Sequence, residues 1–372
     1  MSLSSRSGLT VLITNASMRS RSGTVMYVRD LALKLHELGH RPIVFTSALG
    51  PVGDELIERT VPVVDDLDRL GLVPDLIHGH HHPQAMQAIS HFPGVPAIFV
   101  CHDWMAWQDV PPQHPRILRH CAVDHTCRDK LVAMNGIPEA MTRVLYNAVD
   151  LRRFQPRAPL PPRPKRAVVF TNYQYDVTPV REACARLGIA LDELGAASGR
   201  TVGAPEAVLG AYDLVFAKAR TAIEAMAVGC AVVVCDFRGI AGLVRSDNFD
   251  GLRELNFGAR SLKHPHETDR LCREIERYDP ADAERVAAKI RDTAGLDALA
   301  ADYLELYREV IEEYRRAPAD AAAEGRAVAR YIRDWGFTRR WQWEHEKLLR
   351  RMPRGLIRAA KRLLIGEPGR QP

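Results

Sequence analysis

Short apolar runs alternate with helical patterns along most of the sequence, and this alternation constrains the fold more than any other feature. Residues 11–14 predict a buried strand. The helix predicted after it has Val28, Leu31, Ala32, Leu35 and Leu38 on one face, with Gly39 at its end. Strand, helix and strand at this spacing predict parallel βαβ units. Further strands are predicted at 42–46, 76–78, 97–101, 122–124 and 144–146.

A proline-rich segment separates this pattern from a second one. Residues 154–166 contain five prolines in thirteen residues, which a helix or a central strand would not tolerate, so a linker is predicted. Beyond it, helices are predicted from Pro179 to Gly188, over 221–228, and from 266 to about 314. The strands predicted there are 167–171, 190–194, 214–216 and 231–235.

Two open α/β domains and a tail account for this organisation. A chain of 372 residues is too long for one ordinary core. We predict an N-terminal Rossmann-like domain over 1–155, a second over 156–314 and a helical basic tail over 315–372. In open parallel sheets, ligands bind at the carboxyl ends of the strands.

Composition narrows the class of protein. The net charge of +5 is modest and does not by itself argue for nucleic acid, for which a clustered basic face is expected. Residues 350–372 hold seven basic residues against one acid, so the rest of the chain is near neutral. Seven cysteines, an odd number without a Cys-x-x-Cys pair, indicate free thiols in a reducing, cytoplasmic compartment. Neither a signal peptide nor a membrane span is predicted.

Four segments stand out in order along the chain: Ser22-Gly23-Thr24 before a helix ending Leu38-Gly39-His40, then 75–80, 146–156 and 223–229. Together they resemble family 4 of the GT-B glycosyltransferases, over about residues 11–314. The resemblance implies two Rossmann-like parallel-sheet domains facing a cleft. It further implies a nucleotide-diphosphate sugar held by the second domain and an acceptor of unknown identity held by the first. Transfer with retention and no metal or other cofactor is implied as well.

The sequence departs from that family at the donor side. Phe216 occupies the position of a usual acid, and Ala217 and Ala219 replace glycines. The segment 171–173 stands where the family has a basic pair, and we assign its Asn172 to the donor site. A divergent subgroup is therefore indicated.

Glu224 is the first donor-binding candidate. A carboxylate can accept hydrogen bonds from both hydroxyls of a ribose, which is the role that the resemblance implies. Thr221 and Glu224 also have the spacing of a helix capping box, which would explain the acid without a ligand. Both interpretations stay open, and Thr221 is assigned to the donor site.

Lys218 and Arg220 precede the same helix. A helix N-terminus with nearby cations attracts phosphate and would stabilise a departing nucleoside diphosphate. We hypothesise that they replace the missing basic pair; incidental charge in a solvated loop is the alternative.

Gly23 and Thr24 open the first helix. A residue without a β-carbon allows a phosphate or sugar to approach the backbone closely. A simple helix cap would also explain this segment, and a dinucleotide fingerprint is incomplete here.

His102 and Asp103 follow a predicted strand and are the catalytic candidates. The resemblance implies that His102 contacts the acceptor or the transferred sugar, and a neutral imidazole could accept a hydroxyl proton. It also implies an acceptor-side contact for His80. A zinc site at His78, His80, His81 and His82 is not expected. Successive strand residues face opposite ways, so only alternate ones converge, and no Cys or Glu at ligand spacing accompanies them.

The tail has two open interpretations. Trp335, Phe337, Trp341 and Trp343 precede a basic amphipathic segment within 352–364. Such a helix could contact an anionic membrane through 350–370, or it could pack on the second domain. Three alternatives to the transferase remain: a non-catalytic nucleotide or glycan binder, a GT-B sugar-nucleotide epimerase, and an oxidoreductase with two nucleotide-type domains.

Overall fold

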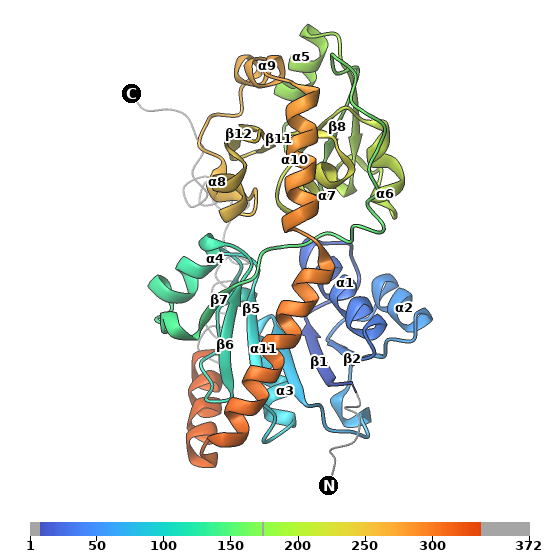
Figure 1. The fold of residues 1–372 in the computed structure, drawn as a ribbon. Helices are drawn as coiled ribbons and strands as arrows, with labels where there is room; N and C mark the ends of the chain where they lie inside the picture. The colour runs from blue at the N-terminus through green and yellow to red at the C-terminus, as the bar shows by residue number, and fades with distance from the viewer. Residues whose placement is uncertain (1–7, 173–174, 336–372) are drawn as a thin grey trace, which may run out of the picture. The chain divides into compact units, whose positions relative to one another are not determined.

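A computed structural model describes residues 8–172 and 175–335 (Figure 1). Its first sheet has seven parallel strands in the order β3-β2-β1-β4-β5-β6-β7. This order places the polar residues that follow β1, β4 and β5 at one edge of the sheet. The strands are β1 (Thr10–Asn15), β2 (Arg41–Thr46), β3 (Val63–Val64), β4 (Leu76–His80), β5 (Ala97–Cys101), β6 (Ile117–Ala122) and β7 (Thr142–Val144).

The first helix packs on this sheet much as its apolar periodicity predicts. Val28, Leu31 and Leu35 are fully buried in the core, and Gly39 has a positive φ of 82° just beyond the helix end. Leu38, which was assigned to the same face, is 48% exposed, because the helix ends at Glu37. The helices between these strands are α1 (Gly23–Glu37), α2 (Pro51–Glu58), α3 (His82–His91) and α4 (His125–Asp129).

The second sheet has five strands in the order β12-β11-β10-β8-β9. Four are parallel, and β12 pairs antiparallel with β11 at the edge. The strands are β8 (Arg166–Phe170), β9 (Ala190–Leu194), β10 (Leu214–Ala217), β11 (Ala231–Asp236) and β12 (Gly239–Leu243). The helices are α5 (Thr178–Arg186), α6 (Pro205–Val208), α7 (Ala219–Val228), α8 (Phe249–Glu254), α9 (Thr268–Glu276) and α10 (Pro280–Thr293).

The long helix α11 (Leu296–Arg316) contributes to the first core although it follows the second sheet in the chain. Its Tyr303 and Tyr307 are fully buried, and they lie among side chains of β1 and α1. Residues 296–311, which the sequence analysis assigned to the second domain, therefore stabilise the first sheet.

Two predicted strands lie earlier in the chain than predicted, and one strand was missed. The strand predicted at 144–146 is β7, which ends at Val144. The strand predicted at 122–124 is β6, which ends at Ala122 because Asp124 caps α4 through a bond from Cys127 N (2.7 Å). The strand β12 was not predicted, because Gly239 and Gly242 interrupt its apolar pattern.

The proline-rich segment has no helix or strand from 155 to 165, as predicted. It is nevertheless anchored to the second domain. Phe154 is buried in the second core, and Arg157 forms an ion pair with Asp213 (2.9 Å).

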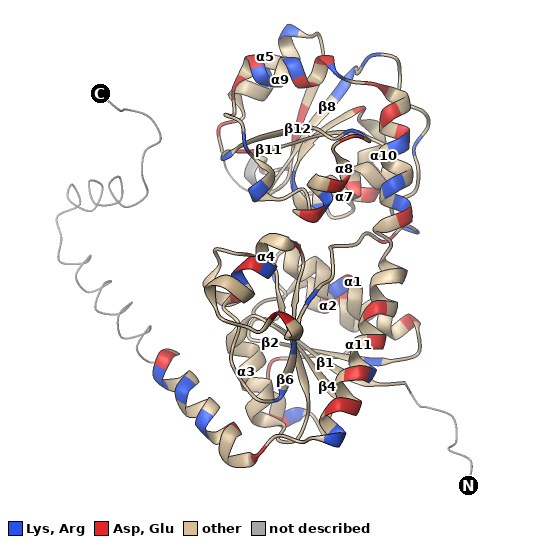
Figure 2. Ribbon diagram, turned by 60° about the vertical axis from the view of Figure 1, so that its left-hand side comes forward, with Lys and Arg blue, Asp and Glu red and all other residues tan. Residues whose placement is uncertain are grey.

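Charged residues of both signs occur along α10 and α11 (Figure 2). Among the described residues, no helix is long and apolar enough to cross a membrane. Residues 321–335 form a further helix that belongs to a second compact unit of the chain. Phe337, Trp341, Trp343 and the basic segment 350–372 lie outside the described residues.

Candidate functional site

One face of α1 carries the first three groups of the candidate site. Gly23, Tyr27 and Asp30 are spaced four and three residues apart, so they lie on the same side of the helix. Tyr27 contacts the predicted histidines and Asp30 pairs with Arg220, while Gly23 is open. The helix therefore connects the glycine loop, the histidines and the α7 segment.

Gly23 is the first residue of α1 and is exposed. A β-carbon built on it would have no protein atom within 4 Å, so the fold itself does not require glycine there. Thr24 beside it is half-buried. The Asn172 amide donates to the carbonyl of Arg21 (3.3 Å), which brings the loop after β8 to the glycine loop.

His80 and His102 come together because β4 and β5 are neighbouring parallel strands. His80 Nδ1 lies 2.7 Å from His102 Nε2, and the ring of Tyr27 contacts His102 edge-on with the centroids 4.8 Å apart. Burial holds the pKa of both histidines well below the usual value, so both imidazoles are neutral at ordinary pH.

His80 lies beneath His102 and has no exposed surface. It stacks on His78, whose Nδ1 is 2.5 Å from the Tyr307 hydroxyl. The hydroxyls of Tyr27 and Tyr303 lie 2.7 Å apart in the same core. The direct acceptor contact predicted for His80 would require surface that this side chain does not have, and its observed partner is His102.

The loop after His102 is held in shape by hydrogen bonds to two of its own carboxylates. The backbone N–H of His102 donates to Asp109 Oδ1 (2.7 Å), and burial raises the pKa of that carboxyl to about 6. Asp103 Oδ1 accepts from the backbone N–H groups of Met105 (2.6 Å) and Ala106 (2.8 Å). The observed contacts of Asp103 thus shape the loop that carries His102.

Glu224 lies in the second turn of α7, at the carboxyl end of the central strand β10, and is 7% exposed. The N-terminal cap of α7 is Lys218, three residues before the predicted helix start, and it makes no side-chain capping bond. Glu224 Oε1 instead accepts from Arg220 Nε (2.7 Å). The capping-box interpretation is therefore wrong, and Thr221 lies half-buried within the helix.

Asp30 joins Arg220 to α1. This carboxylate, 4% exposed, forms ion pairs with Arg220, with Arg29 (2.5 Å) and with Arg153 (3.2 Å). Burial alone would raise the pKa of Asp30, but the guanidinium of Arg220, with the other two, holds it below its ordinary value. Burial raises the pKa of Glu224, and Arg220 offsets part of that effect.

Lys218 forms an ion pair with the buried Asp236 at the end of β11. This pairing ties the loop before α7 to the neighbouring strand. Ala219, which replaces a family glycine, has a positive φ of 49°. A side chain in this backbone region is strained by roughly 1 kcal/mol or more. Phe216 is buried in an apolar core and offers no polar group to a ligand.

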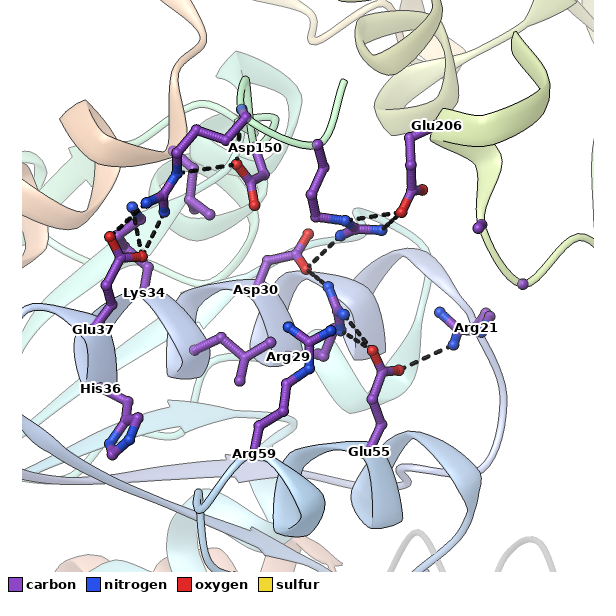
Figure 3. Close-up of a pocket in the computed structure, with 16 residues that line it drawn as sticks. Arg21, Arg29, Asp30, Lys34, His36, Glu37, Glu55, Arg59, Asp150 and Glu206 are labelled. Carbon is purple, nitrogen blue, oxygen red and sulfur yellow. Dashed lines mark hydrogen bonds and ion pairs between the residues drawn. The ribbon is translucent and has the colours of Figure 1, made fainter. Parts of the chain in front are cut away.

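A cavity of about 860 Å³ adjoins the outer part of α1 (Figure 3). Asp30 lines it, and several of its charged residues pair with one another. Arg29 pairs with Glu55 (3.1 Å), and Arg153 pairs with Glu206 (2.8 Å). The charges of these two arginines are thus largely compensated within the protein.

The histidines do not form a metal site in the described part of the chain, where no group of three or more His, Cys, Asp or Glu side chains could hold a metal ion. His81 Nδ1 accepts from the backbone N–H of Ala16 (3.0 Å). His82 instead contacts the ring of Trp107 edge-on at a centroid distance of 5.3 Å.

Comparison with known proteins agrees with this architecture. Residues 21–153 match the model of Glycosyltransferase Family 4. The chain has the GT-B fold, and its match to family 4 covers residues 21–153. No curated protein matches the sequence significantly.

Solved structures similar to this GT-B protein share its fold at low sequence identity. A glycosyltransferase from Rickettsia africae superposes with a TM-score of 0.60 at 14% identity, over 82% of this chain and 99% of that one. The Anabaena protein HepE, in complex with UDP and glucose, has a TM-score of 0.60 at 15% identity, over 80% and 99%. A Listeria monocytogenes protein assigned as a UDP-N-acetylglucosamine 2-epimerase has a TM-score of 0.51 at 15%, over 82% and 97%.

The sequence analysis of this GT-B protein missed Tyr27, Asp30, Asp109 and Asp236. Asp30 lies in the run Arg29-Asp30 within an amphipathic helix, where a charge is normally solvated. Its burial depends on Arg153 and Arg220, which are more than a hundred residues away, so no local pattern could reveal it.

Proposed function

We propose that this protein is a glycosyltransferase that transfers a sugar from a nucleotide-diphosphate sugar to an acceptor. The observation that carries the proposal is the face of α1, along which Gly23 is open, Tyr27 contacts His102, and Asp30 binds Arg220. These contacts gather donor-side and acceptor-side candidates around one helix. A transfer reaction needs both kinds of group close together.

The nucleotide would bind beside α7. Glu224 has one oxygen bonded to Arg220, and its other oxygen would accept from a ribose hydroxyl. Lys218, Arg220 and the N-terminus of α7 would compensate the charge of the departing diphosphate. Uracil is the first base to test, since the related HepE structure contains UDP.

The sugar and the acceptor hydroxyl would meet at His102. Its Nε2 is bonded to His80, so Nδ1 is the ring nitrogen left for a ligand. Gly23 would allow the diphosphate or the sugar to approach the backbone of α1, and Thr24 and Asn172 border that position.

Retention of configuration, independence from metal ions and transfer of a hexose are further proposals, which rest on the resemblance to family 4. We also propose a cytoplasmic location. Free cysteines support it, six of them buried and Cys272 partly buried.

A non-catalytic nucleotide binder is the second candidate. The buried Phe216 favours it, because an acid of the family is replaced there by a core residue. A sugar-nucleotide epimerase of the same fold is a third candidate.

Product analysis separates the three. The protein is incubated with radiolabelled UDP-glucose and UDP-N-acetylglucosamine, with and without candidate acceptors. A transferase releases UDP together with a glycoside or, more slowly, free sugar. An epimerase changes the sugar without releasing UDP, and a binder leaves both donors intact. Lys218→Ala and Arg220→Ala should raise the donor KM or lower kcat; unchanged kinetics in both would contradict their assigned role.

A further inference from the structure

An apolar surface lies on the loop that follows His102. Four large hydrophobic side chains are exposed there within seven residues: Trp104 (44%), Met105 (71%), Trp107 (50%) and Val110 (42%). Clustered exposed hydrophobic side chains are a common mark of a binding surface, whereas single ones are ordinary. We call these four residues the apolar loop surface.

The loop beneath this surface is rigidly held. Lys130, which is buried, donates to the carbonyls of Asp103 (2.8 Å) and Ala106 (3.0 Å). The carboxylates of Asp103 and Asp109 bond to backbone N–H groups of the same loop. These hydrogen bonds fix the backbone of the loop. Binding to its exposed side chains would therefore cost little conformational entropy for ordering the loop.

The chemistry of the loop favours an apolar ligand over a sugar ring. A sugar stacked on tryptophan also needs polar side chains for its hydroxyls. Among residues 103–110, Asp109 is buried and bonded to backbone, Asp103 is bonded to backbone through Oδ1, and Gln108 is the third polar side chain. The surface can remove methylene groups from water, but it can form few hydrogen bonds with a sugar.

We propose that the apolar loop surface binds the hydrocarbon chain of a lipid-linked acceptor. The chain would lie over Trp104, Met105, Trp107 and Val110. Its polar end would then be directed toward His102, which begins the same loop. This proposal rests on the proposed transferase function, because it names the class of acceptor for that site.

Alkyl β-glucosides, kept below their micelle concentrations, test the proposal by calorimetry on the full-length protein. Burial of one methylene contributes about 0.8 kcal/mol, so two additional methylenes should tighten Kd by roughly tenfold. We expect this gain from hexyl to octyl glucoside, and no measurable binding of methyl glucoside.

Matched surface variants locate the site. Trp104→Ser, Met105→Ser and Trp107→Ser should each weaken octyl glucoside binding several-fold without lowering Tm. Val73→Ser and Phe237→Ser remove exposed hydrophobic side chains elsewhere (68% and 54%) and should leave Kd unchanged.

Three outcomes would overturn the proposal. Binding that is independent of chain length and is competed by methyl glucoside would indicate a sugar platform. Binding to phosphatidylcholine–phosphatidylglycerol vesicles alone, without binding of monomeric glucosides, would indicate a membrane-docking surface. Equal loss in the loop variants and the control variants would indicate nonspecific adsorption.

The outcomes distinguish a failure of this proposal from a failure of the transferase proposal. If chain-length-dependent binding at this loop persists while no nucleotide binds, the apolar site stands and the transferase function is refuted. If nucleotides bind and no glucoside does, the proposed class of acceptor is refuted alone.

Discussion

His80 Nδ1 is 2.7 Å from His102 Nε2, and this hydrogen bond determines how His102 can act. Both rings are neutral, so one nitrogen donates and the other accepts. His80 Nε2 is buried with no partner among the described residues. An unpaired acceptor is tolerated more often than an unpaired N–H, which favours donation by His80 Nδ1. His102 would then carry its proton on Nδ1, as a hydrogen-bond donor to a ligand oxygen instead of the general base expected from the sequence.

Substitutions at His80 should act through His102. Asparagine can place an amide near the position of Nδ1, whereas leucine removes the bond. We expect His80→Leu to lower kcat at least tenfold with little change in nucleotide Kd, and His80→Asn to retain much of the activity. Steady-state kinetics and nucleotide titration provide the two measurements. Equal kcat in the two variants would show that the bond does not position His102.

Stability should fall as the pH decreases below about 6.5. Burial lowers the pKa of His78 to about 3, and of His81, His82 and His120 to about 4. Between those values and 6.5 the unfolded chain binds more protons, so the free energy of unfolding rises with pH in this window. Asp109, with its pKa raised to about 6, and Glu224, whose pKa burial also raises, act in the opposite direction, but the buried histidines, with His80 and His102 among them, outnumber these two acids.

Thermal melts between pH 4.5 and 7.5 measure this dependence. His78→Asn removes one titrating ring and keeps a polar group near Tyr307, so the dependence of Tm on pH should become shallower. A Tm that is constant over this range would contradict the assignment of buried neutral histidines.

Loss of Asp30 should destabilise the fold more than loss of Glu224. Asp30→Asn leaves three guanidinium groups without their shared carboxylate, and breaking a buried ion pair costs about 3–5 kcal/mol. Glu224→Gln leaves Arg220 paired with Asp30, so we expect a smaller loss. Denaturant unfolding ranks the two variants, and the reverse order would show that Asp30 is not the centre of the network.

Gly23→Ala should raise the stability of the fold and weaken the binding of the nucleotide sugar. Alanine has the higher helix propensity, and the position is open, so the fold should gain up to roughly 1 kcal/mol. Nucleotide-sugar binding should weaken, because a methyl group would occupy the space that a ligand needs. Gly251→Ala in α8, also an open helical position, is the matched control and should leave binding unchanged. Unchanged nucleotide-sugar binding in Gly23→Ala would show that Gly23 is not part of the binding site.

The alternating pattern predicted most of the sheet architecture. Strands β5 and β9 occur at the predicted residues, and Gly188 and Gly229 follow helix ends with positive φ. Such features depend on local periodicity and on backbone conformation, both of which the sequence displays directly.

The site was less predictable because its contacts are distant in the chain. The partners of Arg220 show the difference: Glu224, four residues away on one helix, could be anticipated, whereas Asp30, 190 residues away, could not. The bond between His80 and His102 similarly required the pairing of β4 with β5.

Binding of UDP measured by thermal shift tests the central claim most directly. A ligand at a hundred times its Kd stabilises the folded state by about 2.7 kcal/mol. The account predicts that UDP or another nucleoside diphosphate raises Tm in proportion to the logarithm of its concentration, and that Glu224→Gln abolishes most of this shift. If no nucleoside diphosphate shifts Tm, or if the shift is unchanged in Glu224→Gln, the proposed donor site is contradicted.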